Sequence, residues 1–561
     1  MADSPSNRTG AEVLAEMLSA YGVTHFFLVP SVFNQSLMEM ERRTSIVRVH
    51  AHGEKAAAYM ADGYARASGR PGVVGAQVVG ALNLAAGLRD AHLAHSPVIA
   101  LTGGRHPLLK HRQPYQEVDD VPAFAQVTKF NATVDDVTRF PDMIRQAFRS
   151  ATTGNPGPVH LQFRGNEGQI DADSGPMEPI VDPRFARVPP FRPAPEDSDV
   201  AAALSLLRSA ERPVIVVGGG ARQSGAGQEV LRVAEALQIP LATSLNGKEL
   251  VPASHPLSVG VVGSYSRECA NKVVAAADLV CFLGSETGGM VTAFWTLPKP
   301  GTTVVQFDLD AANLGRNYPL AAAVNGDARV SLQRLLELNG DQPAPARDAW
   351  LGQVRDLIAQ WRAEHAPLIT AEESPIRPER LAYDLSQLVP DNAAIVVDTG
   401  HAGVWMGGYF DISAGQRYIR SSGHLGWAFP AGMGVKAALP DRPVVVFTGD
   451  AGMWYHIGEI ETAVRWGLNT ITVVNNNSGG NQTRNGYGWV YEGTGLERDR
   501  ELWAFGEVDF AKIAEDVGAL GLRVDQPSDL EPAMKQALAA DRPVVINVRT
   551  DPDIMAPRVG S

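Results

Sequence analysis

Cysteine, positive charge and long apolar runs are all scarce in this chain of 561 residues. The two cysteines, Cys269 and Cys281, are too few for a disulfide scaffold and are typical of a reducing compartment. A formal net charge of −13 provides no overall basic field, so we expect no nucleic-acid partner. No apolar run reaches the length of about 18 residues that a membrane helix needs, and the first residues lack a basic-then-apolar signal pattern. We therefore expect a cytoplasmic protein with no membrane partner.

Apolar residues are plentiful enough for several packed domains. Hydrophobic residues make up 45% and charged residues 20% of the chain, a balance typical of globular proteins. At about 100 to 200 residues per domain, the length predicts three or four domains. The 55 glycines and 38 prolines are scattered through apolar segments without a short repeat, which favours many tight turns between strands and helices.

Three segments contain strand-like apolar runs that alternate with helical patterns. In the first segment, β-rich runs at 72–79 and 158–163 accompany stretches of helical periodicity such as 54–68. This alternation predicts parallel sheets that helices cover on both faces. The predicted fold class is α/β, with three doubly wound parallel-sheet domains at residues 1–170, 196–340 and 376–550. Between the first and second domains we expect a proline-rich linker at 171–195. After the third domain we expect a tail at 551–561 that can close over a site as a lid.

Polar turns follow two neighbouring apolar runs in the third segment. The first run ends in Gly449–Gly452, and the second ends in Asn475–Asn477. Because the carboxyl ends of adjacent parallel strands open on one crevice, Asp450, the amide oxygen of Asn477 and the carbonyl of Gly479 would offer hard oxygen ligands suited to Mg²⁺. The glycines would let backbone N–H groups approach phosphates. Taken singly, either motif is more often an ordinary turn.

The pair of motifs is more informative than either alone. Asp450 and Asn477 lie 27 residues apart, and the segment resembles the thiamin-diphosphate (ThDP) enzymes, in which a GDG-like start and an NN end flank such a stretch. The resemblance implies ThDP and Mg²⁺ as cofactors, with a pyrimidine-binding first domain and a diphosphate-binding third domain. Ala451 departs from the glycine usual in the family, but the metal ligand would be the preceding aspartate.

A glutamate in the first domain completes the resemblance. The stretch from His50 to Val73 is similar to the family segment whose glutamate hydrogen-bonds the aminopyrimidine ring and promotes its reactive tautomer, which places that role on Glu54. The alternative is a glutamate that only complements the dipole of a helix start. Gly53 departs from the histidine usual in relatives.

Further positions around the cofactor follow from the same resemblance. The backbone of Gly400–Ala402 would hold the terminal phosphate. The carbonyl of Gly423 and the side chain of Leu425 would hold the pyrimidine and bend the cofactor, although Leu425 can also be a plain core residue. The complete set of predicted cofactor-binding residues is Glu54, Gly400, His401, Ala402, Gly423, Leu425, Gly449, Asp450, Ala451, Gly452, Asn477, Gly479 and Gly480.

The residues that would contact substrate are less clearly marked. Tyr115 and Gln116 resemble a loop that reaches toward the thiazolium in relatives, and the alternative is simple loop structure. Glu492, in the polar and aromatic run that follows the metal motif, is a candidate base. His424, beside Leu425, is the histidine most suited to act in the site. We predict these four residues and Glu54 as the catalytic set.

The central domain carries a glycine run after its first apolar strand. Gly220, Ala221 and Arg222 lie where relatives bind FAD, the ADP part of CoA, or nothing. A glycine run is weak evidence, because short turns between strands and helices need glycine anyway. We expect ADP or CoA to be compatible with this domain and do not expect FAD.

The resemblance spans nearly the whole chain and implies an enzyme. It is nearest to the acetolactate synthase, benzoylformate decarboxylase and oxalyl- or 2-hydroxyacyl-CoA lyase groups. We expect a Mg²⁺- and ThDP-dependent C–C lyase, of decarboxylase or carboligase type, that acts on a 2-hydroxyacyl-CoA or a 2-oxo acid through an acyl-anion intermediate. One alternative is an acetolactate synthase-type condensation of two 2-oxo acids, a reaction that in the family normally needs FAD. An alternative of another class is an inactive ThDP-fold regulatory or binding subunit.

The resemblance also implies assembly. Glu54 and Asp450 belong to different domains, and in this family to different subunits, so we expect at least a homodimer and, by the family habit, a homotetramer. The partner in turnover would be a small-molecule substrate.

Overall fold

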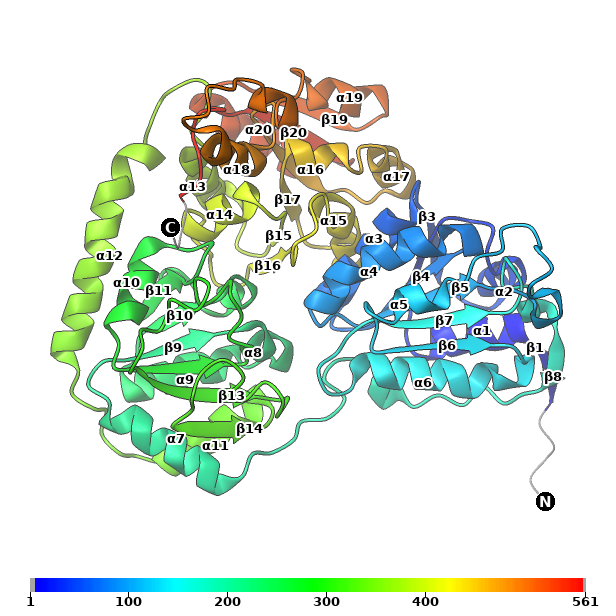
Figure 1. Cartoon of the computed structure of the whole chain (residues 1–561), viewed down its shortest axis with the longest axis horizontal. Helices are drawn as coiled ribbons and strands as arrows, with labels where there is room; N and C mark the ends of the chain where they lie inside the picture. Colours follow the sequence, from blue (N-terminus) through cyan, green and yellow to red (C-terminus); the bar gives the residue numbers. More distant parts are fainter. Residues whose placement is uncertain (1–5, 558–561) are drawn as a thin grey trace.

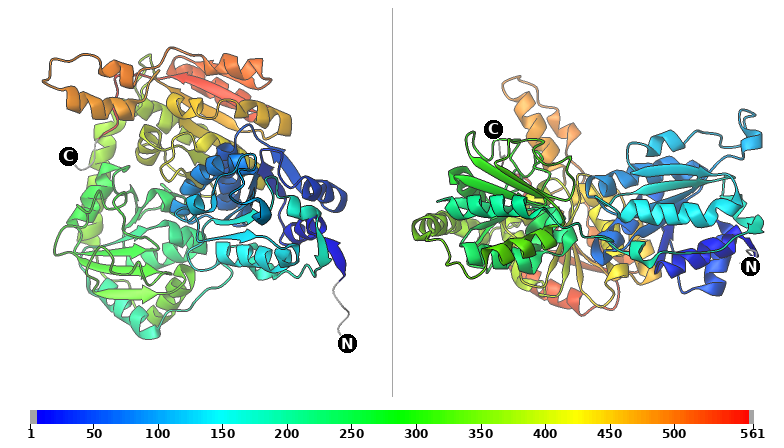
Figure 2. Two further views of the ribbon diagram at one scale, coloured as in Figure 1. Left: turned by 45° about the vertical axis from the view of Figure 1, so that its right-hand side comes forward. Right: turned by 90° about the horizontal axis from the view of Figure 1, so that it is seen from below.

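A computed structural model describes residues 6–557 as three α/β domains, each built on a six-stranded parallel sheet (Figure 1). The predicted fold class is confirmed. Figure 1 shows the central and N-terminal domains side by side below the C-terminal domain, and Figure 2 gives two further views of the arrangement. The side chains of His95 and Glu286 meet at 2.8 Å between the N-terminal and central domains. Residues 1–5 of the predicted first domain and 558–561 of the predicted tail lie outside the described residues.

The N-terminal sheet has the strand order β3-β2-β4-β5-β7-β6. Every residue of β4, β5 and β7 is buried, because helices cover both faces of a parallel sheet, and this explains their continuous apolar runs. The strands are β2 (His25–Leu28), β3 (Val47–His50), β4 (Gly72–Ala76), β5 (Val98–Gly103), β6 (Phe130–Val134) and β7 (Val159–Phe163). The principal helices are α1 (Gly10–Ala20), α2 (Asn34–Arg43), α3 (Glu54–Ser68), α4 (Ala81–Leu93), α5 (Val121–Phe124) and α6 (Phe140–Thr152).

The C-terminal sheet repeats this topology with the order β16-β15-β17-β18-β20-β19. In both sheets, the strands run second, first, third, fourth, sixth and fifth in chain order. The strands are β15 (Ala394–Val397), β16 (Arg417–Arg420), β17 (Val444–Gly449), β18 (Ile471–Asn476), β19 (Leu520–Val524) and β20 (Val544–Arg549). The helices are α13 (Pro378–Leu388), α14 (His401–Gly408), α15 (Ala428–Ala438), α16 (Asp450–Trp454), α17 (Glu459–Trp466), α18 (Asn481–Tyr491), α19 (Phe510–Asp516) and α20 (Leu530–Leu538).

The central sheet has a different order, β11-β10-β9-β12-β13-β14. Its strands run third, second, first, fourth, fifth and sixth, which is the order of doubly wound nucleotide-binding domains, with a crevice where the order reverses between β9 and β12. The strands are β9 (Pro213–Val217), β10 (Leu241–Thr243), β11 (Ser258–Val261), β12 (Leu279–Leu283), β13 (Thr303–Asp308) and β14 (Ala322–Asn325). The helices are α7 (Asp197–Ser209), α8 (Gly219–Ser224), α9 (Gly227–Leu237), α10 (Glu268–Ala276) and α11 (Ala328–Asn339).

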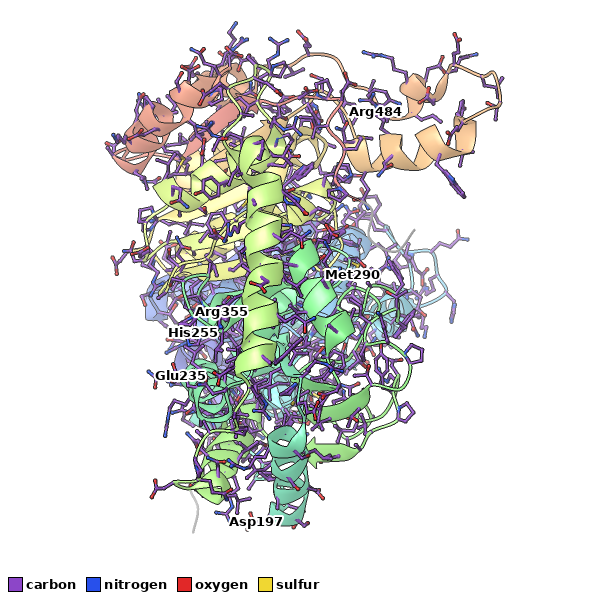
Figure 3. The ribbon with its side chains drawn as sticks, turned by 90° about the vertical axis from the view of Figure 1, so that its left-hand side faces the viewer. Asp197, Glu235, His255, Met290, Arg355 and Arg484 are labelled. Carbon is purple, nitrogen blue, oxygen red and sulfur yellow. The ribbon has the colours of Figure 1, made fainter. Side chains whose placement is uncertain are left out.

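The connections between domains run along the outside. The stretch predicted as a linker contains β8 (Ser174–Pro176), which pairs antiparallel with β1 (Asn7–Thr9) and so ties back to the N-terminal domain. The long helix α12 (Asp348–Ile369) joins the central domain to the C-terminal domain and crosses the front of the view in Figure 3. Across residues 6–557, no helix has both the length and the apolar character needed to cross a membrane.

The N-terminal and C-terminal domains share one hydrophobic core, which continues from α3 and α4 into the C-terminal sheet. At its centre α3 packs against α15 through backbone contact. A Cβ added at Gly63 would lie 2.1 Å from the carbonyl oxygen of Ala431, and one added at Gly434 would lie 1.8 Å from that of Met60. Only glycine allows the two helices to approach this closely, so the two domains are held at a fixed spacing.

We expect Gly63→Ala to destabilise the protein by about 1–3 kcal/mol, because the new methyl group would meet backbone that cannot move without separating the helices. Gly352→Ala is the matched control. It replaces another helical glycine, on α12, where the nearest atom to the added Cβ is the end of Arg355 at 3.9 Å, and it should stabilise by about 0.5–1 kcal/mol. Urea unfolding measures both variants, and shifts of the same sign would contradict the close contact of α3 and α15.

Candidate active site

Three adjacent strands of the C-terminal sheet end at one place. Strand β15 pairs with β17, with Val397 opposite Phe447, and β17 pairs with β18, with Gly449 opposite Asn475. The segments that follow these strands therefore begin side by side at the carboxyl edge of the sheet. This edge brings together Asp398 and the turns of residues 449–452 and 475–480.

Asp450 is the first residue of α16 and is buried beside the second turn. Its Oδ2 accepts a hydrogen bond of 2.8 Å from the backbone N–H of Gly479, and burial raises its pKa to about 7. The Oδ1 atoms of Asn475 and Asn477 are buried and have no hydrogen-bond partner within residues 6–557. Buried oxygen atoms left unpaired beside a buried carboxylate form a donor set that fits Mg²⁺. The residues predicted as metal ligands therefore lie together, and their role stays a prediction.

Asp398 joins the loops of this edge, and the sequence analysis assigned it no role. Its carboxylate accepts hydrogen bonds from the backbone N–H of Thr399 at 2.8 Å, from that of Gly426 at 3.1 Å, and from the hydroxyl of Thr448 at 2.9 Å. Burial raises its pKa to about 7. A Cβ at Gly452 would lie 2.7 Å from Oδ2 of Asp398, so glycine is required there. An acidic residue directly after the buried run of β15 is the signal that marks it.

The predicted phosphate loop leads into α14. Gly400 precedes the helix with a φ of +68°, which favours glycine. The first N–H groups of an α-helix have no partner within the helix, so those at the start of α14 are suited to meet an anion. His401 and Ala402 lie in this first turn. Burial lowers the pKa of His401 to about 4, and its Nδ1 is without a partner among the described residues. A Cβ at Gly400 would lie 2.6 Å from Oε1 of Gln482, which places the start of α18 beside the loop.

The other end of α14 is held by the central domain. The buried Nζ of Lys248 donates to the carbonyl oxygens of Met406 at 2.7 Å and Gly407 at 3.1 Å. A cation at a helix C-terminus stabilises the helix through the helix dipole. The partial positive charge at the N-terminus of α14 is directed at the predicted phosphate loop. No motif in the sequence indicates this contact between domains.

The predicted pyrimidine loop lies between the same sheet edge and α3. Gly423 is exposed and Leu425 only partly buried, so Leu425 is not an ordinary core residue. The hydroxyl of Tyr59, on α3, lies 2.5 Å from Nδ1 of His424. Burial raises the pKa of Tyr59 and lowers that of His424, so both groups are neutral and the tyrosine hydroxyl donates a hydrogen bond to Nδ1 of the imidazole. His424 is thereby held next to Leu425.

Glu54 begins α3 on the N-terminal domain. Its Oε2 accepts a hydrogen bond of 3.2 Å from the side-chain amide of Asn83, and a Cβ at Gly80 would lie 2.3 Å from its Oε1. Within residues 6–557, the hydrogen bond that the Glu54 carboxylate accepts therefore comes from the N-terminal domain, to which Glu54 itself belongs. The backbone N–H of Gly53 donates to Glu459 of α17 at 3.1 Å, so the start of α3 is anchored to the C-terminal domain. The described chain does not place Glu54 against Asp450.

The predicted substrate residues are not gathered at this edge within the described chain. Tyr115 is 80% exposed on the loop between β5 and α5, and Gln116 follows it with a φ of +62° and a buried Oε1 that lacks a partner in the described structure. Glu492 is exposed after the end of α18. Helix α18 projects from the domain in Figure 3, and Arg484 on it donates to the carbonyl oxygen of Pro552 in the tail. The roles predicted for these residues remain untested.

A cavity of about 440 Å³ lies at the carboxyl ends of β9, β12 and β13 of the central domain, where residues of the N-terminal and C-terminal domains also line it. Gly220 and Arg222 line it, and the Nε of Arg222 is buried without a partner in the described structure. Ala221 is instead part of the hydrophobic core beneath, so its predicted contact with a ligand is not supported. Asp308, at the end of β13, and Arg420, from the C-terminal domain, also line the cavity.

Comparison with known proteins places three family models along the chain. "Thiamine pyrophosphate enzyme, N-terminal TPP binding domain" matches residues 8–123, the "central domain" of the same enzymes matches 200–335, and the "C-terminal TPP binding domain" matches 398–548. A probable acetolactate synthase large subunit of Methanocaldococcus jannaschii is 31% identical, with 98% of this chain and 93% of the relative covered. The acetolactate synthase large subunit of Parasynechococcus marenigrum is 30% identical, with 98% of this chain and 88% of the relative covered. The isozyme 3 large subunit of Escherichia coli is 28% identical, with 97% and 95% covered.

Proposed function

Because this chain belongs to the thiamine-pyrophosphate-dependent enzymes, in the group that includes the acetolactate synthase large subunits, we propose that it condenses two 2-oxo acids with loss of CO₂. The comparisons favour this alternative over the broader lyase prediction, and they give no support to a 2-hydroxyacyl-CoA substrate. The observation that carries the proposal is the buried carboxylate of Asp450 at the adjoining ends of β17 and β18, with the amide oxygen of Asn477 in the turn that follows β18 left without a partner among residues 6–557.

In this proposal, each part of the sheet edge holds one part of the cofactor. Asp450, Asn477 and the carbonyl of Gly479 would hold Mg²⁺, and the N–H groups that start α14 would hold the terminal phosphate. Gly423 and Leu425 would hold the pyrimidine. Bound thiamin diphosphate supplies the nucleophilic carbon and the electron sink that C–C bond cleavage next to a carbonyl requires. The chain itself contributes orientation, exclusion of water and proton transfer.

Glu54 would exchange a proton with the pyrimidine ring, and we propose that it does so on a second copy of the chain. Its contacts in the described chain lie within its own domain. Large apolar side chains are exposed beside both halves of the proposed site: Val79 and Leu82 near Glu54, and Trp454 and Tyr455 after Asp450. Exposed apolar groups of this size beside a proposed site are typical of an interface and support a homodimer, from which a tetramer would form by further contacts.

Product analysis tests the proposed reaction. Purified protein with ThDP and Mg²⁺ is incubated with pyruvate, with 2-oxobutanoate and with a 2-hydroxyacyl-CoA, and the products are identified by mass spectrometry. We expect two molecules of pyruvate to give one CO₂ and one branched 2-hydroxy-3-oxo acid. Turnover of the acyl-CoA alone would favour the lyase alternative. ThDP binding without turnover of any substrate would favour the inactive subunit, although such a subunit has no need of Glu54, Asp450 and Asn477 together.

We propose that the central cavity holds the adenine nucleotide part of a ligand. The strand order of this domain places the cavity at the crevice where nucleotides bind in doubly wound sheets. Asp308 ends β13 with a buried carboxylate suited to a ribose hydroxyl, and Arg222 offers an unpaired N–H to a phosphate. Free ADP, CoA and FAD share this chemistry.

Arg222→Met is expected to weaken ADP binding by about 10- to 100-fold, because a charge-assisted hydrogen bond is lost. Arg355→Met, on the exposed side of α12 in Figure 3, should leave binding unchanged. Calorimetric titration with ADP and CoA measures both variants. An absorption spectrum of the purified protein reports any flavin, and we expect none. Equal ADP affinity in wild type and Arg222→Met would contradict the assigned phosphate contact.

A further inference from the structure

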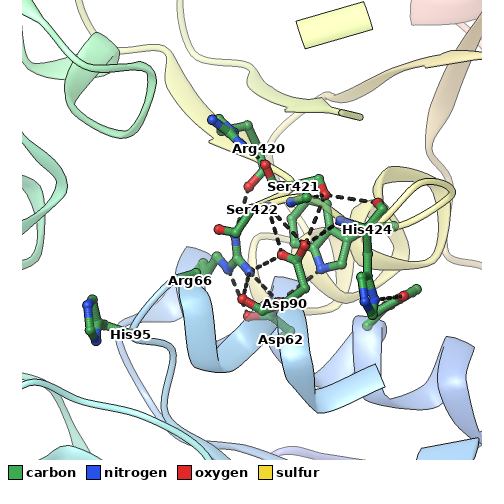
Figure 4. A network of polar contacts seen from close by, with 12 residues as sticks. Asp62, Arg66, Asp90, His95, Arg420, Ser421, Ser422 and His424 are labelled. Atoms are coloured by element: carbon green, nitrogen blue, oxygen red, sulfur yellow. Dashed lines mark hydrogen bonds and ion pairs between the residues drawn. The ribbon is translucent and has the colours of Figure 1, made fainter. Parts of the chain in front are cut away.

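A buried network of polar side chains joins the N-terminal domain to the predicted pyrimidine loop, residues 421–425 (Figure 4). Its centre is Asp90 on α4, whose carboxylate is fully buried. The buried positions of α4 are otherwise occupied by apolar residues and glycine. A buried carboxylate is costly unless it is paired and hydrogen-bonded, so its contacts indicate what it stabilises.

The contacts of Asp90 are concentrated on that loop. Its two carboxylate oxygens accept from the backbone N–H of Ser422 at 3.0 and 2.9 Å, and Oδ2 also accepts from the backbone N–H of His424 at 3.1 Å and from the hydroxyl of Ser421 at 2.9 Å. Arg66, on α3, donates to Oδ1 at 2.6 Å. Burial alone would raise the pKa of Asp90. The charge of Arg66 and the N–H donors of the loop outweigh this effect and hold the pKa below its ordinary value.

The same network fixes the residues on either side of the loop. Arg66 also donates to the carbonyl oxygen of Arg420 at 2.7 Å, just before the loop. The indole N–H of Trp427, just after it, donates to Asp62 at 2.9 Å. Asp62 in turn accepts from Nε of Arg66 at 2.8 Å. Helices α3 and α4 therefore hold the loop before, within and after its turn.

The shape of the loop depends on these anchors. Gly423, between the two N–H groups that Asp90 binds, is exposed and has a φ of +146°, a conformation that L side chains rarely adopt. A Cβ at Gly423 would meet nothing within 4 Å, so glycine is favoured here by its backbone conformation and not by close packing. The hydrogen bonds that hold this conformation are those of Ser422 and His424 to Asp90 and that of the Gly423 N–H to the hydroxyl of Ser421 at 3.1 Å, and Ser421 itself donates to Asp90.

We propose that Asp90 is a positioning residue for the cofactor: it holds Ser422 and His424 so that Gly423 and Leu425 present the correct backbone and side chain to the aminopyrimidine of thiamin diphosphate. Asp90 acts through the loop and touches no part of the cofactor. The inference rests on the proposed function, in which this loop binds the pyrimidine. It predicts that Asp90 affects one end of the cofactor, because the diphosphate end depends on Asp450, Asn477 and the start of α14.

Asp90→Asn tests this separation of the two ends. The substitution keeps the shape of the side chain but replaces one acceptor oxygen by an NH₂ group that faces N–H donors. The affinities for thiamin diphosphate and for inorganic pyrophosphate are measured by calorimetry in the presence of Mg²⁺. We expect the Kd for thiamin diphosphate to rise by about 10- to 100-fold, the range of supporting contacts around a bound group, and the Kd for pyrophosphate to stay unchanged.

Asp171→Asn is the matched control. Asp171 is also buried in the N-terminal domain, and it accepts from the backbone N–H and the hydroxyl of Ser36, both at 2.9 Å, away from the loop. It should change neither affinity. If Asp90→Asn fails to fold, Ser421→Ala replaces it. This variant removes the hydroxyl that donates to Asp90 at 2.9 Å and accepts from the N–H of Gly423 at 3.1 Å, so it loosens the same anchor of the loop. It should weaken the binding of thiamin diphosphate by a smaller factor, about 3- to 10-fold, and leave the binding of pyrophosphate unchanged.

Two results would overturn the positioning role. One is an equal loss of affinity for thiamin diphosphate and for pyrophosphate in Asp90→Asn, because loss of a purely structural residue would affect both ends of the site. The same result in Ser421→Ala counts equally if that variant is used. The other is wild-type affinity for both ligands. Failure of the wild-type protein to bind thiamin diphosphate would overturn the proposed function instead, so the two failures are distinguishable.

Discussion

Glu54→Gln is expected to lower kcat by about 10²- to 10⁴-fold and to leave the Kd for thiamin diphosphate nearly unchanged. Glutamine keeps the size of the side chain and an oxygen for the amide of Asn83, but it cannot exchange a proton with the pyrimidine ring. Steady-state kinetics with pyruvate give kcat, and calorimetry gives the Kd.

A matched control for this variant is Glu229→Gln, which changes a buried glutamate of the central domain that pairs with Arg329. It should retain the kcat of the wild type. Wild-type kcat in Glu54→Gln would remove Glu54 from the mechanism and leave the helix-dipole interpretation of this residue.

Gly80→Ala probes the position of the same carboxylate without changing its chemistry. The backbone φ of Gly80 is −84°, so alanine fits the conformation, but its Cβ would lie 2.3 Å from Oε1 of Glu54 and must displace it. Displacement of a catalytic group by about 1 Å can cost about 10²-fold in rate, and we expect a loss of kcat of this size. Unchanged kcat with a folded protein would show that the carboxylate does not need its present position.

Asp450→Asn is expected to weaken thiamin diphosphate binding at fixed Mg²⁺ by on the order of 100-fold or more, because it removes the only full negative charge of the proposed metal ligands. Pyrophosphate affinity should fall with it, unlike the effect expected for Asp90. Calorimetry at several Mg²⁺ concentrations measures the loss. Wild-type affinity in this variant would place the metal elsewhere.

Asp384→Asn provides the control for this substitution. Asp384 lies on α13 of the same domain and pairs with Arg380. Asp384→Asn should leave the affinities for thiamin diphosphate and pyrophosphate unchanged. The comparison separates removal of the proposed metal ligand Asp450 from the removal of any one negative charge in the domain.

The sequence was sufficient to predict the sheet edge that holds the candidate site. Continuous apolar runs mark strands that are buried on both faces, and the polar turns after them mark the carboxyl ends of those strands. The parallel pairing of Gly449 with Asn475 then places Asp450 next to the residues after β18, as the spacing indicated. The three-domain α/β organisation followed from the same alternation of strands and helices.

Contacts between elements far apart in the sequence could not be predicted in this way. Asp90 and Ser422 are separated by more than half of the chain, and only the packing of α3 against α15 brings them together. The one sequence signal for Asp90 is an acidic residue among the apolar positions of α4, which indicates a buried carboxylate but not its partners. Ala221 marks a second limit: a glycine run indicates a turn near a ligand but does not tell which of its side chains point toward the cavity and which, like that of Ala221, pack in the core.

The most direct test of the whole account combines the two strongest variants. Glu54→Gln and Asp450→Asn chains are co-expressed, and condensation of pyruvate is measured with saturating thiamin diphosphate and Mg²⁺. If Glu54 of one copy acts on the cofactor that Asp450 of another holds, a mixed dimer has one intact site, and random pairing restores about a quarter of wild-type activity. Activity no greater than that of either variant alone would contradict a site shared between two chains.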